Sequence, residues 1–397
     1  MPGFEVFGNE ERKEVNDVLN SGVLMRYGFD GMRNGHWKAK EFEINFAARM
    51  GVQHCQLVSS GTSALTVALA AAGIGAGDEV IIPTFTFVAS FESILATGAV
   101  PVLVDIDDTL TLSPKAVENA ITRKTRCIMP VHMCGSMANL AALKAICVKH
   151  NLILLEDACQ AIGASYAGKP LGSYGDLGCF SFDFVKTITC GEGGAVITNN
   201  KKYFTLADQY QDHGHDHLGS DRGAETHPNL GYNFRISELH AAVGIAQLRK
   251  LDAILELQKR NYLIIRKELS KLAEITFRRV PETGVENYSF VNFFLPNAPL
   301  AEKAHKALAE NGVDACFYWF KNNWHYINGW EHFRNLNSLG RLPSEICSQI
   351  KNYNEIDFSN SDAIMGRTIS TLVKIGWSEE DVKNRAIKMR EAIASVL

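Results

Sequence analysis

The sequence lacks several features that would place the protein in other classes. It has no uninterrupted apolar run long enough to span a bilayer, and its N-terminus, MPGFEVFGNEERKEV, has no apolar core like that of a signal peptide. Its net charge is −4 and it has no long basic run, so a nucleic-acid partner is not expected. Its nine cysteines include no CxxC pair, and most lie among apolar residues as reduced cysteines do. We therefore expect a cytoplasmic protein without a membrane segment.

The chain does contain enough apolar material for a large core. It has 397 residues, 46% of them hydrophobic, which supports one large domain and a smaller second one. Short apolar strands alternate with helices up to about residue 200, and this predicts an α/β fold with a doubly wound, mostly parallel sheet. From about residue 255 the alternation becomes less regular. We expect residues 1–252 to form the large domain and 253–397 a smaller α+β domain.

Two segments between these parts have a distinctive composition. Residues 203–234 are polar, and we expect them to form a long loop, which in a compact domain is usually functional or mobile. Residues 237–272 have a helical pattern and begin at Ser237, a suitable capping residue. They predict one long helix, and the domain boundary should lie inside or just after it.

One stretch, GCFSFDFVKTITCGEGGAVITNN at residues 178–200, contains a single lysine, Lys186. Burial disfavours the ammonium form, so a partly desolvated lysine gives up its proton more easily and attacks a carbonyl. The glycines at 191–194 allow tight turns that side chains would block. A strand that ends in a glycine loop, with a lysine reaching solvent, is the alternative, and this stretch alone does not decide between them.

Other polar residues lie at or near predicted strand ends, where ligands bind in doubly wound sheets. Ser59-Ser60-Gly61-Thr62 joins an apolar strand to a helix, and the free N–H groups at a helix N-terminus bind phosphate. Asp157 and Gln160 follow the strand LILLE. Each feature alone is better explained by ordinary structure, such as a helix cap. Together, a phosphate turn, a carboxylate at a strand end and a later lysine meet the requirements of pyridoxal phosphate.

At this point the chain resembles the DegT/DnrJ/EryC1/StrS sugar aminotransferases, which have the type I, aspartate-aminotransferase-like fold and use pyridoxal phosphate. The matching stretches are SSGTSAL (59–65), GDEVIIPTFTFVAS (77–90), GAVPVLVDID (98–107), EDACQAIGASYAGKPLGSYGDLGCFSF (156–182), KTITCGEGGAVITNN (186–200) and GYNFRISELHAAVGIAQLRKLD (231–252). The resemblance therefore covers most of residues 10–252 and implies that the chain is a transaminase.

The resemblance also implies a role for each matched residue. Lys186 would hold the cofactor covalently and move protons, and Asp157 would pair with the pyridine nitrogen. Asn233, in GYNFR, would reach the phosphate of the neighbouring subunit's cofactor, so the active unit would be a homodimer with shared active sites. The other implied cofactor contacts are Gly61, Thr62 and Ser63 of the phosphate turn, the Ser181 hydroxyl, Gln160 beside the ring hydroxyl, and Phe87 stacked on the ring.

Two loops depart from the usual pattern of this family. LMRYGFDGMRNGHWK contains Arg26 and Arg33, and DHGHDHLGSDRGAETHP contains His215 and Arg222. Because arginine binds carboxylates in bidentate fashion, these groups would suit an acidic sugar at the mouth of the site. The alternative is that the arginines are solvated or form ordinary salt bridges. The histidines lack the i, i+4 spacing of a helical metal site, so no metal is expected.

These loops, with VHMCGSMA (131–138) and FYWFKNNWHY (317–326), resemble one subgroup of the family. Its members move an amino group from L-glutamate to the C8 aldehyde of oxidised 3-deoxy-manno-octulosonate (Kdo), giving 8-amino-3,8-dideoxy-manno-octulosonate for lipopolysaccharide. We therefore expect a keto or aldehyde sugar acid as substrate. The alternative is a transaminase of a nucleotide-linked 4-keto-6-deoxy sugar, although no second glycine-rich phosphate loop is present.

Two further alternatives are less favoured by the residues. Related sugar dehydratases replace the lysine with histidine, whereas this chain has Lys186. Related regulators carry an added DNA-binding domain, and no helix-turn-helix pattern precedes residue 50.

Overall fold

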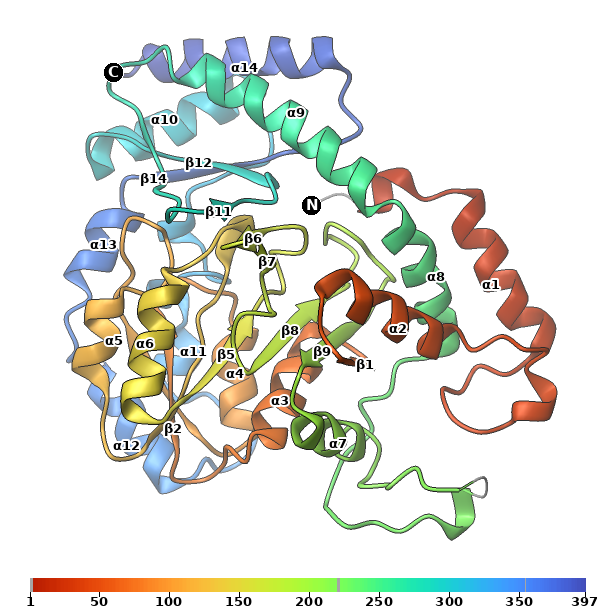
Figure 1. The fold of residues 1–397 in the computed structure, drawn as a ribbon. Helices are drawn as coiled ribbons and strands as arrows, with labels where there is room; N and C mark the ends of the chain where they lie inside the picture. The colour runs from red at the N-terminus through yellow and green to blue at the C-terminus, as the bar shows by residue number, and fades with distance from the viewer. Residues whose placement is uncertain (1–2, 220–221, 354) are drawn as a thin grey trace.

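The computed structural model describes residues 3–219, 222–353 and 355–397, and it is organised around a seven-stranded sheet (Figure 1). The strand order is β1-β9-β8-β5-β4-β2-β3, and only β9 runs antiparallel to its neighbours. The strands are β1 (His54–Val58), β2 (Glu79–Pro83), β3 (Val100–Val104), β4 (Thr125–Ile128), β5 (Ile153–Asp157), β8 (Leu177–Ser181) and β9 (Gly194–Thr198). The predicted α/β fold with a mostly parallel sheet is confirmed.

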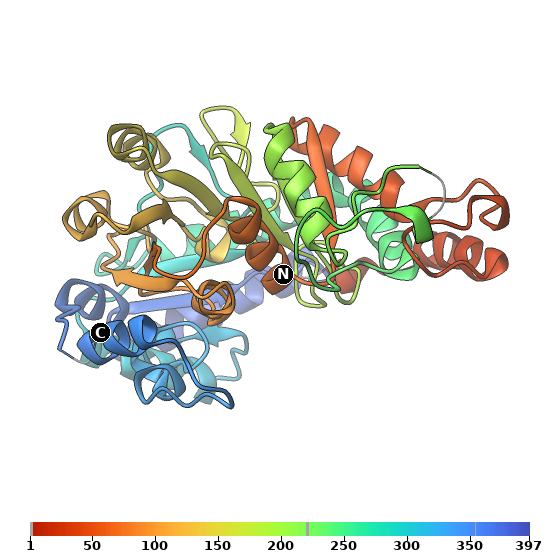
Figure 2. The same cartoon turned by 90° about the horizontal axis from the view of Figure 1, so that it is seen from below.

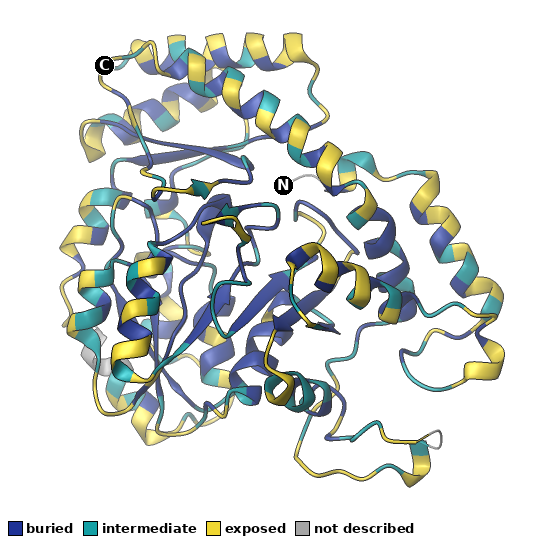
Figure 3. Cartoon of the chain, viewed as in Figure 1, coloured by how far each residue is buried: buried dark blue, intermediate teal, exposed yellow. Residues whose placement is uncertain are grey.

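The strands are apolar on both faces because helices cover both sides of the sheet (Figures 1 and 3). Val80 and Ile82 of β2 belong to the core cluster with α3 and α4, whereas Ile81 between them packs with α5 and α6. This alternation follows from the two-residue period of a strand. The helices before residue 250 are α1 (Asn9–Ser21), α2 (Lys38–Met50), α3 (Gly61–Ala71), α4 (Ala89–Ala96), α5 (Pro114–Ala120), α6 (Leu140–His150), α7 (Lys201–Tyr210) and α8 (Glu238–Arg249).

A second, antiparallel sheet lies in the C-terminal part of the chain, in the order β10-β12-β14-β13. Its strands are β10 (Thr276–Phe277), β12 (Phe290–Phe294), β13 (Cys316–Phe317) and β14 (Thr368–Leu372). The helices of this part are α9 (Leu251–Leu269), α10 (Ala298–Glu310), α11 (Glu331–Arg334), α12 (Ser344–Tyr353), α13 (Ser359–Met365) and α14 (Glu379–Ala394). A short antiparallel pair is formed by β6 (Ser165–Tyr166) and β7 (Lys169–Pro170), to which β11 (Gly284–Val285) adds a third strand.

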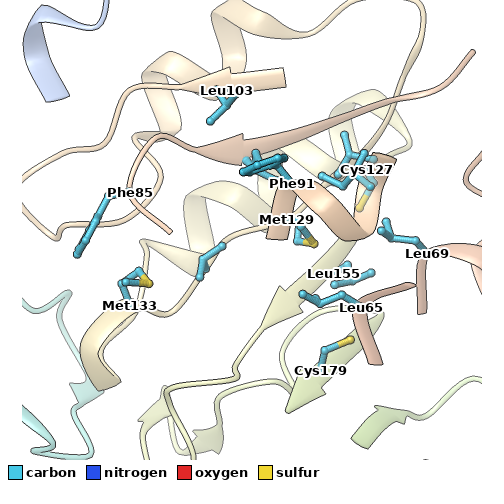
Figure 4. Packing of buried hydrophobic residues seen from close by; sticks show 14 of the residues in the cluster. Leu65, Leu69, Phe85, Phe91, Leu103, Cys127, Met129, Met133, Leu155 and Cys179 are labelled. Atoms are coloured by element: carbon cyan, nitrogen blue, oxygen red, sulfur yellow. The ribbon is translucent and has the colours of Figure 1, made fainter. Parts of the chain in front are cut away.

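The C-terminal part also contributes side chains to the core of the large sheet. The main cluster contains Leu65 of α3, Phe91 of α4 and Met129 (Figure 4), and it extends to Tyr326 and Trp330. Seen from below, the C-terminal segment lies along one side of the large sheet rather than apart from it (Figure 2). This packing places residues near 320 against the strand ends that are expected to form the site. The division of the chain at residue 252 remains a prediction.

The structure corrects two expectations about local structure. Residues 201–210 form helix α7, so the loop predicted for 203–234 begins only after Tyr210; residues 220–221 of that segment lie outside the described residues. Asn200 caps α7 by accepting hydrogen bonds from two backbone N–H groups, which a composition-based loop assignment overlooked.

The predicted long helix is two helices that meet at Lys250. Lys250 has φ −89° and ψ −8°, and its ammonium group donates hydrogen bonds to the Val6 carbonyl and to Glu11 at 2.7–2.9 Å. This contact ties the break to the N-terminal segment. Within the described ranges, no helix is both long and apolar enough to cross a membrane.

Candidate active site

Asp157 ends strand β5 and is buried, at 3% exposure. Its Oδ2 accepts a hydrogen bond from the Ser90 hydroxyl at 2.8 Å, and its Oδ1 accepts one from the Cys159 backbone N–H at 3.1 Å. The hydroxyl of Ser90 is in turn 2.6 Å from that of Thr86, one helical turn earlier. The carboxylate is therefore held in one orientation. The sequence analysis quoted TFTFVAS but did not assign the supporting hydroxyls, although their i, i+4 spacing was visible.

The turn before α3 has the properties of an anion site. Ser60 caps the helix by accepting a hydrogen bond from the Ser63 N–H at 3.0 Å, which leaves the first N–H groups, of Gly61 and Thr62, without a helical partner. A Cβ on Gly61 would lie 2.7 Å from Cβ of Ser181. Only glycine allows this close approach, and it brings the Ser181 hydroxyl beside the helix N-terminus. The turn and Ser181 are thus brought together as predicted.

Lys186 lies on the turn that follows β8 and is half-buried. Its N–H donates to the Asp183 carbonyl, and its own carbonyl accepts from the Gly3 N–H, both at 3.0 Å. Within the described part of the chain, its ammonium group has no ion pair or hydrogen bond. Burial lowers the pKa of His325 and raises the pKa of Cys159, and the charge of Lys186 adds to the first shift and opposes the second.

Gln160 and Phe87 occupy the sides of the same region. The Gln160 side-chain oxygen accepts a hydrogen bond from the Cys134 N–H at 3.0 Å, which leaves its amide nitrogen as the group that can donate to a ligand. Phe87 is half-buried, and its ring lies 5.9 Å from the Trp324 ring and 5.4 Å from the His325 ring. The C-terminal segment around residue 324 therefore contributes one wall of the site.

His325 is a site residue to which the sequence analysis gave no role. The segment that carries it is bound to the connection between β2 and α4 by two hydrogen bonds, from the Thr86 N–H to the His325 carbonyl and from the Val88 N–H to the Trp324 carbonyl, each 3.0 Å. Burial and the charge of Lys186 lower the pKa of His325 to about 3. The imidazole is therefore neutral at physiological pH. Only the folded structure could reveal it, because more than ninety positions along the chain separate it from the other predicted site residues.

The three arginines that were expected at the mouth of the site differ in their availability. Both carboxylate oxygens of Glu43 accept hydrogen bonds from Arg26 at 2.6 Å. Arg33 is 1% exposed, donates to two backbone carbonyls and lies 3.8 Å from the centre of the Trp37 ring. Arg26 thus forms the ordinary salt bridge that the sequence analysis gave as the alternative, with a residue of α2, and Arg33 binds carbonyls of its own loop. A substrate role for either residue remains a prediction, and it would require the guanidinium to exchange partners.

Arg222 and His215 lie in a charged cluster where the loop at 21–38 meets the segment after α7 (Figures 1 and 2). Arg222 donates to Asp212 at 2.7 Å, and its Nη1 has no hydrogen-bond partner among the described residues. His215 Nδ1 lies 2.7 Å from Glu225, and burial and the Arg222 charge lower its pKa. Burial also opposes charge on the neighbouring His217, but its contacts with Asp208 and Asp212 raise its pKa to about 9. No set of three or more His, Cys, Asp or Glu side chains in the described ranges is placed to hold a metal.

Asn233 is exposed, and it lies next to Phe234, whose carbonyl accepts a hydrogen bond from the Ser59 N–H at the turn before α3. Its backbone pairs with that of Asp212 in an antiparallel bridge. Leu230 and Tyr232 beside it are also exposed, at 92% and 59%. A contact between Asn233 and a second subunit is compatible with this position and remains a prediction.

The fold and these groups define a pyridoxal-phosphate enzyme of the type I fold. Helix N–H groups lie beside the Ser181 hydroxyl at Gly61, a buried carboxylate ends β5, and the Lys186 ammonium group has no ion pair or hydrogen bond among the described residues. The phosphate, pyridine nitrogen and aldehyde of the cofactor would each find a suitable group here. The model of the DegT/DnrJ/EryC1/StrS aminotransferase family matches residues 6–386, and the chain belongs to this family.

Several relatives are sugar or cyclitol aminotransferases by name. A GDP-perosamine synthase of Vibrio cholerae is 38% identical over 270 residues, which are 67% of this chain and 69% of the relative. An L-glutamine:2-deoxy-scyllo-inosose aminotransferase of Streptomyces paromomycinus is 38% identical over 73% of this chain and 68% of its own length. A solved aminotransferase from Psychrobacter cryohalolentis has a TM-score of 0.84 and 26% identity, with 98% of both chains covered.

These findings identify the class of reaction that the chain catalyses. The chain is an aminotransferase that acts with pyridoxal phosphate on a keto sugar and an amino donor. The bound cofactor supplies an electron sink for the carbon that gains or loses nitrogen.

Proposed function

We propose that this aminotransferase transfers an amino group from L-glutamate to the C8 aldehyde of oxidised 3-deoxy-manno-octulosonate, giving 8-amino-3,8-dideoxy-manno-octulosonate in the cytoplasm for lipopolysaccharide. The observation that carries the sugar-acid assignment is Arg222. Its guanidinium is half-buried in a loop cluster, binds Asp212 through one nitrogen and leaves Nη1 without a hydrogen bond among the described residues. A carboxylate is the group that such a guanidinium nitrogen binds well.

The residues at the strand ends have separate roles in this proposal. The N–H groups of Gly61 and Thr62, with the hydroxyls of Ser63 and Ser181, hold the phosphate. Asp157 keeps a proton on the pyridine nitrogen, and Gln160 donates to the ring hydroxyl. Phe87 covers one face of the ring and excludes water there. Lys186 holds the cofactor and moves the proton between the two carbon positions.

A transaminase of a nucleotide-linked 4-keto-6-deoxy sugar is the second candidate. It is favoured by the names of the relatives, because the GDP-perosamine synthases of Vibrio cholerae and of Escherichia coli O157:H7 are 38% and 34% identical to this chain. The identity of the amino donor is open in the same way, since three relatives are named for L-glutamine. Both candidates share the proposed cofactor contacts and differ only in what the outer loops bind.

A substrate panel separates the two candidates. Purified holoenzyme is incubated with Kdo 8-aldehyde, a GDP-linked and a UDP-linked 4-keto-6-deoxy sugar, each with L-glutamate or L-glutamine, and the amino product is measured by mass spectrometry. We expect the highest kcat/KM with the Kdo aldehyde and L-glutamate. A nucleotide-linked sugar as the better substrate would replace this proposal with the second candidate.

The arginine assignment has its own control within this panel. Arg222→Lys retains the charge but loses the bidentate geometry, so it should raise KM for the sugar acid and leave the half-reaction with the amino donor nearly unchanged. Arg12→Lys on the exposed face of α1 is the matched control. Unchanged KM values in Arg222→Lys would remove this residue from the substrate site.

We also propose that two chains form each active unit, with Asn233 of one chain reaching the phosphate in the other. Lys186→Ala and Asn233→Ala proteins, each weakly active or inactive alone, should regain activity when their subunits exchange. In a mixed dimer one site is intact and the other carries both substitutions, so recovery should reach about a quarter of wild type after random exchange. Subunit exchange is checked with two affinity tags, and no recovery after confirmed exchange would place both residues in one chain's own site.

A further inference from the structure

His325 occupies a fixed position beside the expected cofactor face. Its ring lies 5.4 Å from the Phe87 ring and 4.5 Å from the Trp319 ring, and its carbonyl accepts a hydrogen bond from the Thr86 N–H at the end of β2. Lys186 is the one charged group whose field acts on this imidazole strongly enough to lower its pKa, among the described residues. The ring therefore packs on the aromatic wall that Phe87 and Trp319 form.

The hydrogen bonds around His325 determine which ring nitrogen carries the proton. Nδ1 lies 3.0 Å from Oδ1 of Asn322. The same Oδ1 accepts a hydrogen bond from the Trp324 backbone N–H at 2.9 Å, which identifies this atom as the amide oxygen rather than the nitrogen. Nδ1 must then be the donor. Because the ring is neutral, Nε2 keeps its lone pair and is an acceptor.

We propose that Nε2 of His325 accepts a hydrogen bond from a hydroxyl of the keto sugar close to the carbon that receives the amino group. A neutral acceptor in contact with Phe87, which is proposed to cover the cofactor ring, suits a hydroxyl donor. Sugars carry hydroxyls next to the reacting carbonyl, whereas glutamate and 2-oxoglutarate carry none. Asn322 is the positioning residue that fixes the tautomer. The inference holds for both keto sugars considered above, so it rests on the sugar aminotransferase class and not on the choice between them.

Two substitutions at this position separate hydrogen bonding from packing. His325→Phe keeps a ring against Phe87 and Trp319 but has no acceptor, whereas His325→Gln offers an amide oxygen without the ring. With the better keto sugar of the panel, His325→Phe should lower kcat/KM about five- to tenfold. This factor corresponds to the free-energy contribution of one neutral hydrogen bond. His325→Gln should recover most of this loss.

The half-reactions locate the effect. In His325→Phe, the rates of amino transfer from the donor and to 2-oxoglutarate should stay within about twofold of wild type. Neither molecule has a hydroxyl that could donate to His325, so neither loses a hydrogen bond in this variant. His332→Phe, which alters an exposed histidine of α11, is the control and should leave every step unchanged. An equal loss in all half-reactions, or no loss with the keto sugar, would overturn the proposal. Failure of the Kdo aldehyde in the substrate panel would not overturn it, because the same measurement would then be made with the nucleotide-linked sugar.

Nitrogen NMR provides a readout that does not depend on turnover. In holoenzyme with ¹⁵N-labelled histidine, the His325 signals are assigned by comparison with His325→Gln. We expect an unprotonated Nε2 that shifts upfield on binding of the keto sugar and does not shift with 2-oxoglutarate. A protonated Nε2, or no response to the sugar, would overturn the proposal even where His325→Phe fails to fold.

Discussion

Lys186→Ala is expected to abolish transamination while the protein remains folded. The lysine is proposed both to hold the cofactor and to move the proton between carbons, and proton transfer alone contributes roughly 10²–10⁴-fold to such rates. Its ammonium group has no ion pair or hydrogen bond within the described residues, so its removal costs the fold little. Turnover is measured with saturating donor and keto sugar, and folding by the melting temperature.

Three further observations make this result specific. The visible absorbance of the lysine-bound cofactor should be lost in Lys186→Ala and restored neither by excess cofactor nor by longer incubation. Lys202→Ala, which removes an exposed lysine of α7, should leave absorbance and turnover unchanged. Steady-state transamination that persists in Lys186→Ala would remove this residue from the proposed role.

The sequence predicted the part of the fold that is set by local patterns. Strand β1 runs directly into Ser59-Ser60-Gly61, and strand β2 is a short apolar run, so their existence and order could be predicted. The break at Lys250 could not, because it depends on hydrogen bonds to Val6 and Glu11, more than 200 residues away. A helical pattern continues through this position, and only tertiary contacts interrupt it.

The same distinction applies to the site. Gly61 and Ser181 were each assigned from a motif, and the structure shows why both are needed, since a Cβ at position 61 would collide with Ser181. The arginines of the outer loops had no such motif. Their charge predicted carboxylate binding, but Arg26 binds Glu43, a partner 17 residues along the chain that the sequence does not distinguish from other acidic residues. Charge alone predicts that a partner exists, and not which one.

Asp157→Asn should slow transamination sharply with little effect on the fold. The carboxylate is proposed to keep the pyridine nitrogen protonated, and the loss of one charge-assisted hydrogen bond is worth about 1.5–3 kcal/mol. That corresponds to a rate loss of roughly tenfold to more than a hundredfold. The new amide can still accept from the Cys159 N–H and can donate to the Ser90 hydroxyl, so the local hydrogen bonds survive and only the charge is removed.

Glu156→Gln is the matched control for this loss, because successive residues of a strand face opposite sides of the sheet. Glu156 is fully buried and accepts hydrogen bonds from the backbone N–H groups of Gly172, Tyr174 and Gly175 at 2.7–2.9 Å, away from the proposed cofactor contacts. Its substitution should lower the melting temperature, since an amide nitrogen facing those N–H groups leaves them unpaired, while kcat of the folded enzyme stays near wild type. Asp157→Asn should show the reverse pattern, with kcat lost and the melting temperature kept. If Glu156→Gln instead loses kcat and Asp157→Asn instead lowers the melting temperature, the carboxylate that serves the cofactor is Glu156. The orientation proposed for the end of β5 would then be wrong.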